Sequence, residues 1–138
     1  MANNLSIYIL FKKENLLVTL FNFPNKKVFT EFEIPFLEIV PKLVKTIDLK
    51  LAEHQLDFNS IGSIFIAQRE SRWNSNRLVV AFVQTLAFAF PINIYKKDLG
   101  DSEELDFCGD WNDFLNSFKE ISWKELTPLY NKCPITNT

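Results

Sequence analysis

The side chains that could do chemistry are few and scattered. The chain has one histidine, His54, and two cysteines, Cys108 and Cys133. A zinc site needs four ligands at characteristic spacings, and these three residues meet neither condition. No serine or cysteine nucleophile is recognisable beside His54, so a histidine at a helix end is the favoured interpretation. We therefore expect no metal site and no histidine-based catalysis.

A second group of reactive side chains lies between two apolar segments. Its members are Arg69, Glu70, Ser71, Arg72 and Trp73. A phosphate-cradling loop needs glycines, because backbone N–H groups must converge on the anion and the chain must adopt positive φ. This loop has none, and the three glycines of the chain are scattered at positions 62, 100 and 109. We expect Glu70 to form a solvated ion pair with its arginine neighbours. An aromatic side chain such as Trp73 could serve as a stacking platform for a base.

Carboxylates that could organise catalytic metal ions are missing from the first apolar run. An actin-type or kinase site places an aspartate after the first strand to hold Mg²⁺ and phosphates. A ribonuclease-H-type nuclease needs three or four carboxylates, the first of them within that strand. Residues 5–11 contain no carboxylate, and Phe11 and Lys12 stand where the aspartate would be. We expect no cofactor and no enzymatic activity.

Composition sets the broad class. The chain has 138 residues, of which 47% are hydrophobic and 23% charged, values typical of one globular domain. A net charge of −2 argues against direct nucleic-acid binding, which needs clustered Lys and Arg. We expect no secretory signal, because residues 2–4 are uncharged and the apolar run after them is short. No apolar run reaches membrane-spanning length. A cytoplasmic location with reduced cysteines is predicted.

Hydrophobic periodicity predicts the elements that position these residues. Runs at 5–11, 16–23 and 28–34 predict three antiparallel strands. A helix is predicted over 36–51, with Pro41 shifting its start or bending it. A strand at 61–67, a helix at 78–90 and a strand at 92–95 follow, with the two strands parallel. The order β-β-β-α-β-α-β predicts an α/β, ribonuclease-H-like single lobe of the actin or sugar-kinase type over residues 1–95.

The remaining residues, 96–138, predict a short helical extension in place of a second lobe. Residues 96–107 are acidic and typical of a turn. Asp110 could cap a helix over 110–120. Its apolar stripe would consist of Trp111, Phe114, Leu115 and Phe118. A further short helix is predicted over 123–130.

The segment 61–95 resembles the bacterial TsaB (YeaZ) family. Those proteins carry a strand, a Gly-Pro-Gly-Ser-Phe-Thr-Gly-x-Arg loop and a helix with Gln, Leu and Ala. The residues that keep this pattern are Trp73, Arg77, Gln84, Leu86 and Ala87. The glycines are replaced within 69–75. The resemblance implies that Trp73 packs as a loop anchor rather than serving as a stacking platform for a base. Ile39-Val40-Pro41 is similar to a Leu-Leu-Pro-type element of the family, and Thr127-Pro128-Leu129-Tyr130 to its C-terminal Pro-x-Tyr. The likeness covers residues 7–95.

The resemblance implies a function as a non-catalytic scaffold. TsaB proteins support TsaD, their catalytic paralogue, in making threonylcarbamoyladenosine on transfer RNA. Two helices of TsaB pack against the equivalent pair of TsaD or of a second TsaB. The resemblance thus implies a TsaD-type partner or a homodimer. The interface residues expected here are Phe36, Ile39, Val40, Leu43, Arg77, Val79, Phe82, Val83 and Leu86.

The width of the apolar surface on the second helix supports an interface independently. Apolar residues from Val79 to Phe90 cover an arc of about 200°, roughly twice what one sheet requires. Either a partner or the C-terminal helices must cover the excess. Two alternative functions remain open at this point. One is a nucleotide- or nucleic-acid-processing enzyme on a ribonuclease-H-like frame, and the other is a self-associating domain with no role in modification.

Overall fold

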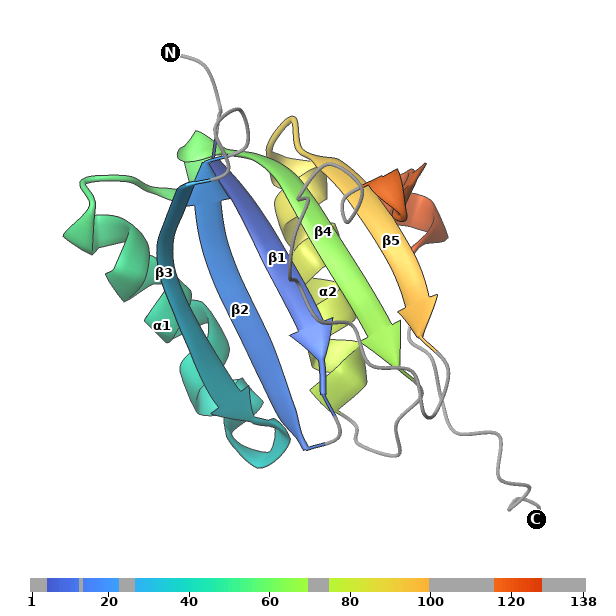
Figure 1. The fold of residues 1–138 in the computed structure, drawn as a ribbon, viewed down its shortest axis with the longest axis horizontal. Coiled ribbons are helices and arrows are strands. Elements are labelled where there is room, and N and C mark those ends of the chain that lie inside the picture. The colour runs from blue at the N-terminus through green and yellow to red at the C-terminus, as the bar shows by residue number, and fades with distance from the viewer. Residues whose placement is uncertain (1–4, 13, 23–26, 70–74, 100–115, 128–138) are drawn as a thin grey trace.

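The fold is a mixed β-sheet with two helices on one face (Figure 1). The computed structural model describes residues 5–12, 14–22, 27–69, 75–99 and 116–127. These residues form a six-stranded sheet in the order β3-β2-β1-β4-β5-β6. The α/β class predicted from the sequence is confirmed. No helix among these residues combines the length and apolar content needed to cross a bilayer.

Three antiparallel strands begin the sheet. β1 (Leu5–Phe11) pairs with β2 (Asn15–Asn22), and β2 pairs with β3 (Lys27–Pro35). Apolar residues dominate β1 and β2, and both strands are buried along most of their length. β3 is the outer strand and is largely exposed. The predicted hairpin arrangement is therefore observed.

On its other side, β1 takes part in parallel pairing. β1 pairs with β4 (Ile61–Arg69), and β4 pairs with β5 (Asn93–Leu99). Each parallel connection is a helical crossover, α1 (Ile39–Glu53) before β4 and α2 (Ser75–Ala89) before β5. Both helices run opposite to the parallel strands, so their N-termini lie at the edge where β1, β4 and β5 end (Figure 1).

The main core lies between the sheet and the two helices. Alternate residues of β1, namely Ile7, Ile9 and Phe11, point into it and are fully buried. α1 contributes one buried residue per turn, and each such side chain stabilises the fold by about 1.5–3 kcal/mol. Those four residues are Ile39, Leu43, Ile47 and Leu51. Pro41 falls in the first turn of α1, where no intrahelical N–H donor is required. A 3₁₀ turn at Phe36–Glu38 precedes the helix.

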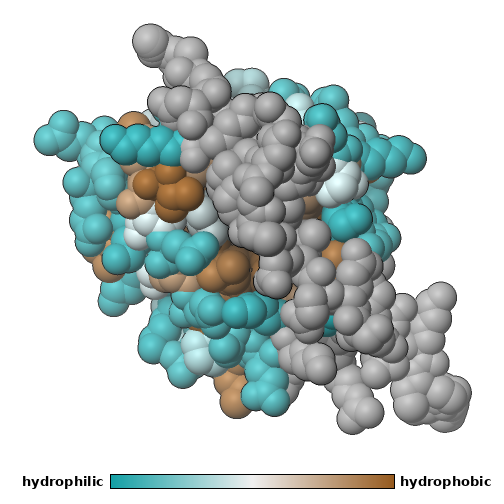
Figure 2. Space-filling model, in the orientation of Figure 1, coloured by the Kyte–Doolittle hydropathy of each residue, from teal (hydrophilic) through white to brown (hydrophobic). Residues whose placement is uncertain are grey.

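A second apolar cluster lies on the opposite face of the sheet. Tyr8, Phe21 and Phe65 are buried there, and Phe118 from the chain after β5 packs on this group. The Phe65 ring stacks on Tyr95 at 4.7 Å and meets the edge of Phe118 at 5.6 Å. Figure 2 looks onto this face, where hydrophobic residues lie between hydrophilic ones over the β2–β3 side of the sheet.

Several predicted boundaries were wrong. α2 begins at Ser75 rather than at residue 78, because the apolar periodicity marks only the buried side and misses a polar first turn. β4 continues through Gln68 and Arg69, which were assigned to the loop. β5 runs to Leu99, so residues 96–99 form a strand and not a turn. Pairing with β4 as far as Arg69 extends β5 despite its charged residues.

The helical extension predicted after residue 96 needs correction where the structure describes it. Lys119–Ile121, the end of the predicted helix, forms strand β6 against β5. Pairing with an open sheet edge outweighs the helical periodicity there. Trp123–Glu125 forms a single 3₁₀ turn, η3, with Ser122 and Glu125 in a capping box. Trp111, Phe114, Leu115, Cys108 and Cys133 lie outside the described residues, as does Tyr130.

Candidate functional site

The carboxyl ends of parallel strands are where α/β proteins usually bind ligands. Here the ends of β1, β4 and β5, which we call the carboxyl edge, present Phe11, Arg69 and Leu99. All three side chains are buried, with exposed fractions of 0%, 7% and 5%. Arg69 Nε donates a hydrogen bond to the Phe11 carbonyl oxygen at 3.2 Å. The described part of this edge is thus packed by apolar groups and one arginine.

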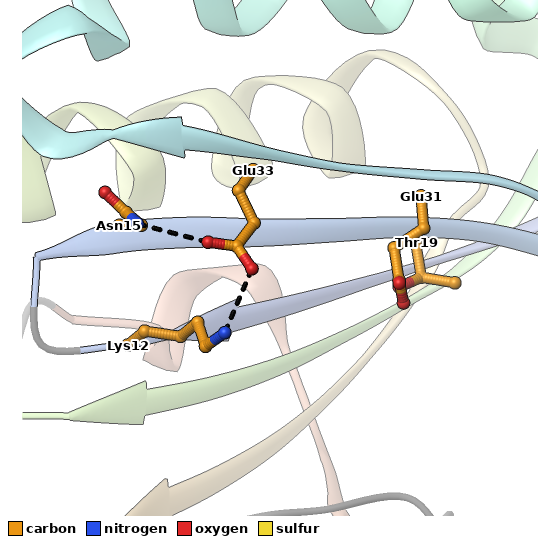
Figure 3. Close-up of polar contacts among 5 residues, drawn as sticks. All are labelled: Lys12, Asn15, Thr19, Glu31 and Glu33. Atoms are coloured by element: carbon orange, nitrogen blue, oxygen red, sulfur yellow. Dashed lines mark hydrogen bonds and ion pairs between the residues drawn. The ribbon is translucent and has the colours of Figure 1, made fainter.

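Glu33 is the carboxylate that the structure places beside the end of β1 (Figure 3). Lys12 Nζ donates to Glu33 Oε2 at 2.9 Å, and Asn15 Nδ2 donates to Oε1 at 3.1 Å. The hydrogen bond from Lys12 is the main cause that lowers the pKa of Glu33, while desolvation opposes it. Glu31, two residues away on β3, accepts a hydrogen bond from Thr19 Oγ1 at 3.0 Å. Both oxygens of Glu33 are therefore already engaged.

The described residues contain no candidate metal-binding site. No group of three or more His, Cys, Asp or Glu residues is arranged there to hold an ion. His54 follows α1, and its ring packs on Phe29 at 5.2 Å. Its Nδ1 lies 3.2 Å from the Lys50 carbonyl oxygen. A helix-end position matches the interpretation made from the sequence.

The loop that replaces the glycine-rich segment is only partly described. Arg69 belongs to β4 and is buried, which corrects its assignment to a solvated loop. Glu70, Ser71, Arg72 and Trp73 lie outside the described residues. The ion pair expected for Glu70 and the anchoring role expected for Trp73 therefore stay predictions.

The residues predicted to meet a partner divide into two sets. Six of them are buried in the chain's own core, where they pack the helices onto the sheet: Phe36, Ile39, Leu43, Val79, Val83 and Leu86. Val40 is 74% exposed, Arg77 is exposed and Phe82 is half-buried against Phe58. The six buried side chains cannot contact a partner while the domain is folded. An interface would have to use the exposed sides of the helices.

The exposed side of α2 is unusually poor in charge. We call it the outer face of α2, and it consists of Leu78, Ala81, Thr85, Phe88 and Ala89, with Arg77 as its one charged residue. No charged residue occurs between Arg77 and Lys96 in the sequence. Phe88 is 74% exposed and Leu78 is 42% exposed. A helix surrounded by solvent normally carries charged residues on its outer side. The outer face of α2 has the composition of a surface that another protein covers.

Sequence reasoning missed Leu78, Ala81 and Phe88 because it followed the residues that point toward the sheet. The missing charge between residues 77 and 96 was the available signal. The C-terminal segment does cover one flank of α2, as one of the alternatives anticipated. Gln84 Nε2 donates to the carbonyl oxygens of Trp123 and Leu126, at 3.1 and 2.8 Å. This cover leaves the outer face of α2 exposed.

The comparison with solved structures identifies proteins of similar fold. No protein-family model and no curated protein matches the chain. Among solved structures, YeaZ from Pseudomonas aeruginosa matches with a TM-score of 0.56 and 17% identity, over 73% of this chain. An uncharacterised protein with similarity to peptidase YeaZ from the same organism matches with a TM-score of 0.50 and 15% identity, also over 73%. The chain covers 44% of the length of each of these two proteins. The resemblance indicated by the sequence is therefore confirmed at the level of structure, and the chain has the fold of YeaZ.

Proposed function

We propose that this chain is a non-catalytic, TsaB-like scaffold subunit that supports a TsaD-type partner in the threonylcarbamoyladenosine modification of transfer RNA. It would act in the cytoplasm and bind no nucleotide and no nucleic acid itself. The observation that carries the proposal is the outer face of α2, on which Arg77 is the one charged residue. The class of partner is the one that the resemblance to TsaB proteins implies, and the fold shared with YeaZ supports that resemblance.

The inner side of α2 explains why the outer face is significant. The side of α2 that packs on the sheet and on α1 is already formed by four buried apolar residues, namely Val79, Val80, Val83 and Leu86. Phe82 and Ala87 also pack partly against the core. Leu78, Ala81, Phe88 and Ala89 face outward and interrupt what would otherwise be a solvated surface. Burying an exposed Phe such as Phe88 in an interface stabilises a complex by about 1.5–3 kcal/mol. The exposed Val40 on α1 would extend the same interface.

The carboxyl edge supports the non-catalytic part of the proposal. Phe11 fills the position after which an actin-type site needs an aspartate, and Arg69 is tied to its backbone. Glu33 is oriented by hydrogen bonds from Lys12 and Asn15, one to each carboxylate oxygen, and the Lys12 ammonium balances its charge. A triphosphate with Mg²⁺ needs free carboxylates and converging backbone N–H groups. This arrangement favours a structural role.

The direct test is binding of the purified chain to the TsaD-type protein encoded in the same genome, measured by calorimetry. Ala81→Asp introduces a charge at an exposed position of the outer face. We expect it to weaken binding at least about tenfold, because a desolvated carboxylate without a partner is costly. The unfolding midpoint in urea should stay unchanged.

A matched control is Ala52→Asp, the same substitution at an exposed position of α1. Position 52 is twelve residues from Val40, which places it about 18 Å along the helix. This variant should bind like the wild type. Equal binding by both variants would refute the interface. Leu86→Asp is unsuitable, because Leu86 is 7% exposed and a charge there would unfold the domain.

The enzymatic alternative is tested with ATP and Mg²⁺ in the calorimeter. The scaffold proposal predicts no binding heat from this titration. A saturable heat would instead support a nucleotide-processing enzyme on this frame. Self-association through the outer face of α2, without the TsaD-type protein, is the third outcome. Sedimentation of the wild type and of Ala81→Asp would identify it.

A further inference from the structure

We draw no further inference here: the strongest candidate, the exposed corner where Phe88 of α2 packs on Trp123 beside the groove at β6, carries nothing, because acidic and basic side chains both border that groove and nothing in the described part of the chain shows what covers it.

Discussion

Arg69 and Phe11 tie two parallel strands together at their carboxyl ends. The guanidinium Nε of Arg69, at the end of β4, donates to the carbonyl oxygen of Phe11, at the end of β1, over 3.2 Å. Neither residue is accessible enough to serve a ligand in solution, since their exposed fractions are 7% and 0%. This hydrogen bond thus joins two strand ends at the edge of the sheet where α/β proteins usually bind ligands.

Removing that hydrogen bond should destabilise the domain. Arg69→Met keeps much of the side-chain volume but leaves the buried Phe11 carbonyl without this donor. We expect a loss of about 1–3 kcal/mol in the free energy of unfolding. Urea denaturation measures it. Lys45→Met, at an exposed position of α1, is the control and should change stability by less than about 0.5 kcal/mol. Equal stability of the two variants would show that the strand tie contributes nothing.

Gln84 should control the local stability of the C-terminal segment. Gln84→Leu removes the donor shared by the Trp123 and Leu126 carbonyl oxygens. β6 has only three residues paired with β5, and the buried side chains of Phe118 and Leu126 hold the chain on either side of it. We expect amide exchange in β6 and η3 to accelerate roughly ten- to a hundredfold, because about 1–3 kcal/mol of local stability is lost.

Exchange in β1 and β4 should not change in the Gln84→Leu variant, because the segment opens without unfolding the sheet. Thr85→Leu, one residue along on the outer face of α2, is the control and should leave β6 as it is. Uniform acceleration across the sheet would mean that the segment and the core unfold together.

The lowered pKa of Glu33 predicts that a small part of the stability of the domain is lost at acid pH. Its pKa is lowered from the usual 4.5, chiefly by the hydrogen bond from Lys12. A lowered pKa in the folded state adds stability that is present above about pH 4.5 and is lost as pH falls through the folded-state value. Glu33→Gln should therefore flatten the dependence of the unfolding free energy on pH below about 5. The same change at Glu53 on α1 serves for comparison. An unchanged slope in Glu33→Gln would place the acid sensitivity elsewhere.

The strands and helices of the first 95 residues could be predicted because their burial repeats regularly. Tyr8 and Ile9 point to opposite faces as strand alternation requires, and Ile39, Leu43 and Ile47 recur at helical spacing. The limits of β5 could not be predicted, since Lys96, Lys97 and Asp98 carry no strand pattern. Their conformation comes from hydrogen bonding to β4, a neighbour that is distant in sequence.

Which residues of α2 face solvent was predicted less well, for a related reason. Periodicity identifies which residues of a helix share a face, but both the core and a partner select apolar residues. Val79 and Phe88 are both apolar residues of α2 but lie on opposite sides of the helix. The sequence alone does not show which side packs on the sheet. The structure separates them, with Val79 fully buried and Phe88 74% exposed.

The central place of β1 in the sheet also bears on how the chain is made. β1 pairs with β2 on one side and with β4 on the other, and it is buried along its whole length. During translation, β2 emerges at once, whereas β4 follows about forty residues later, a delay of a few seconds at roughly 5–20 residues per second. During that interval the edge of β1 that later pairs with β4 is unpaired, and its apolar side chains are exposed near the ribosome exit. Nascent copies on neighbouring ribosomes would be prone to coaggregate, and a chaperone that shields this strand should raise the yield of folded protein.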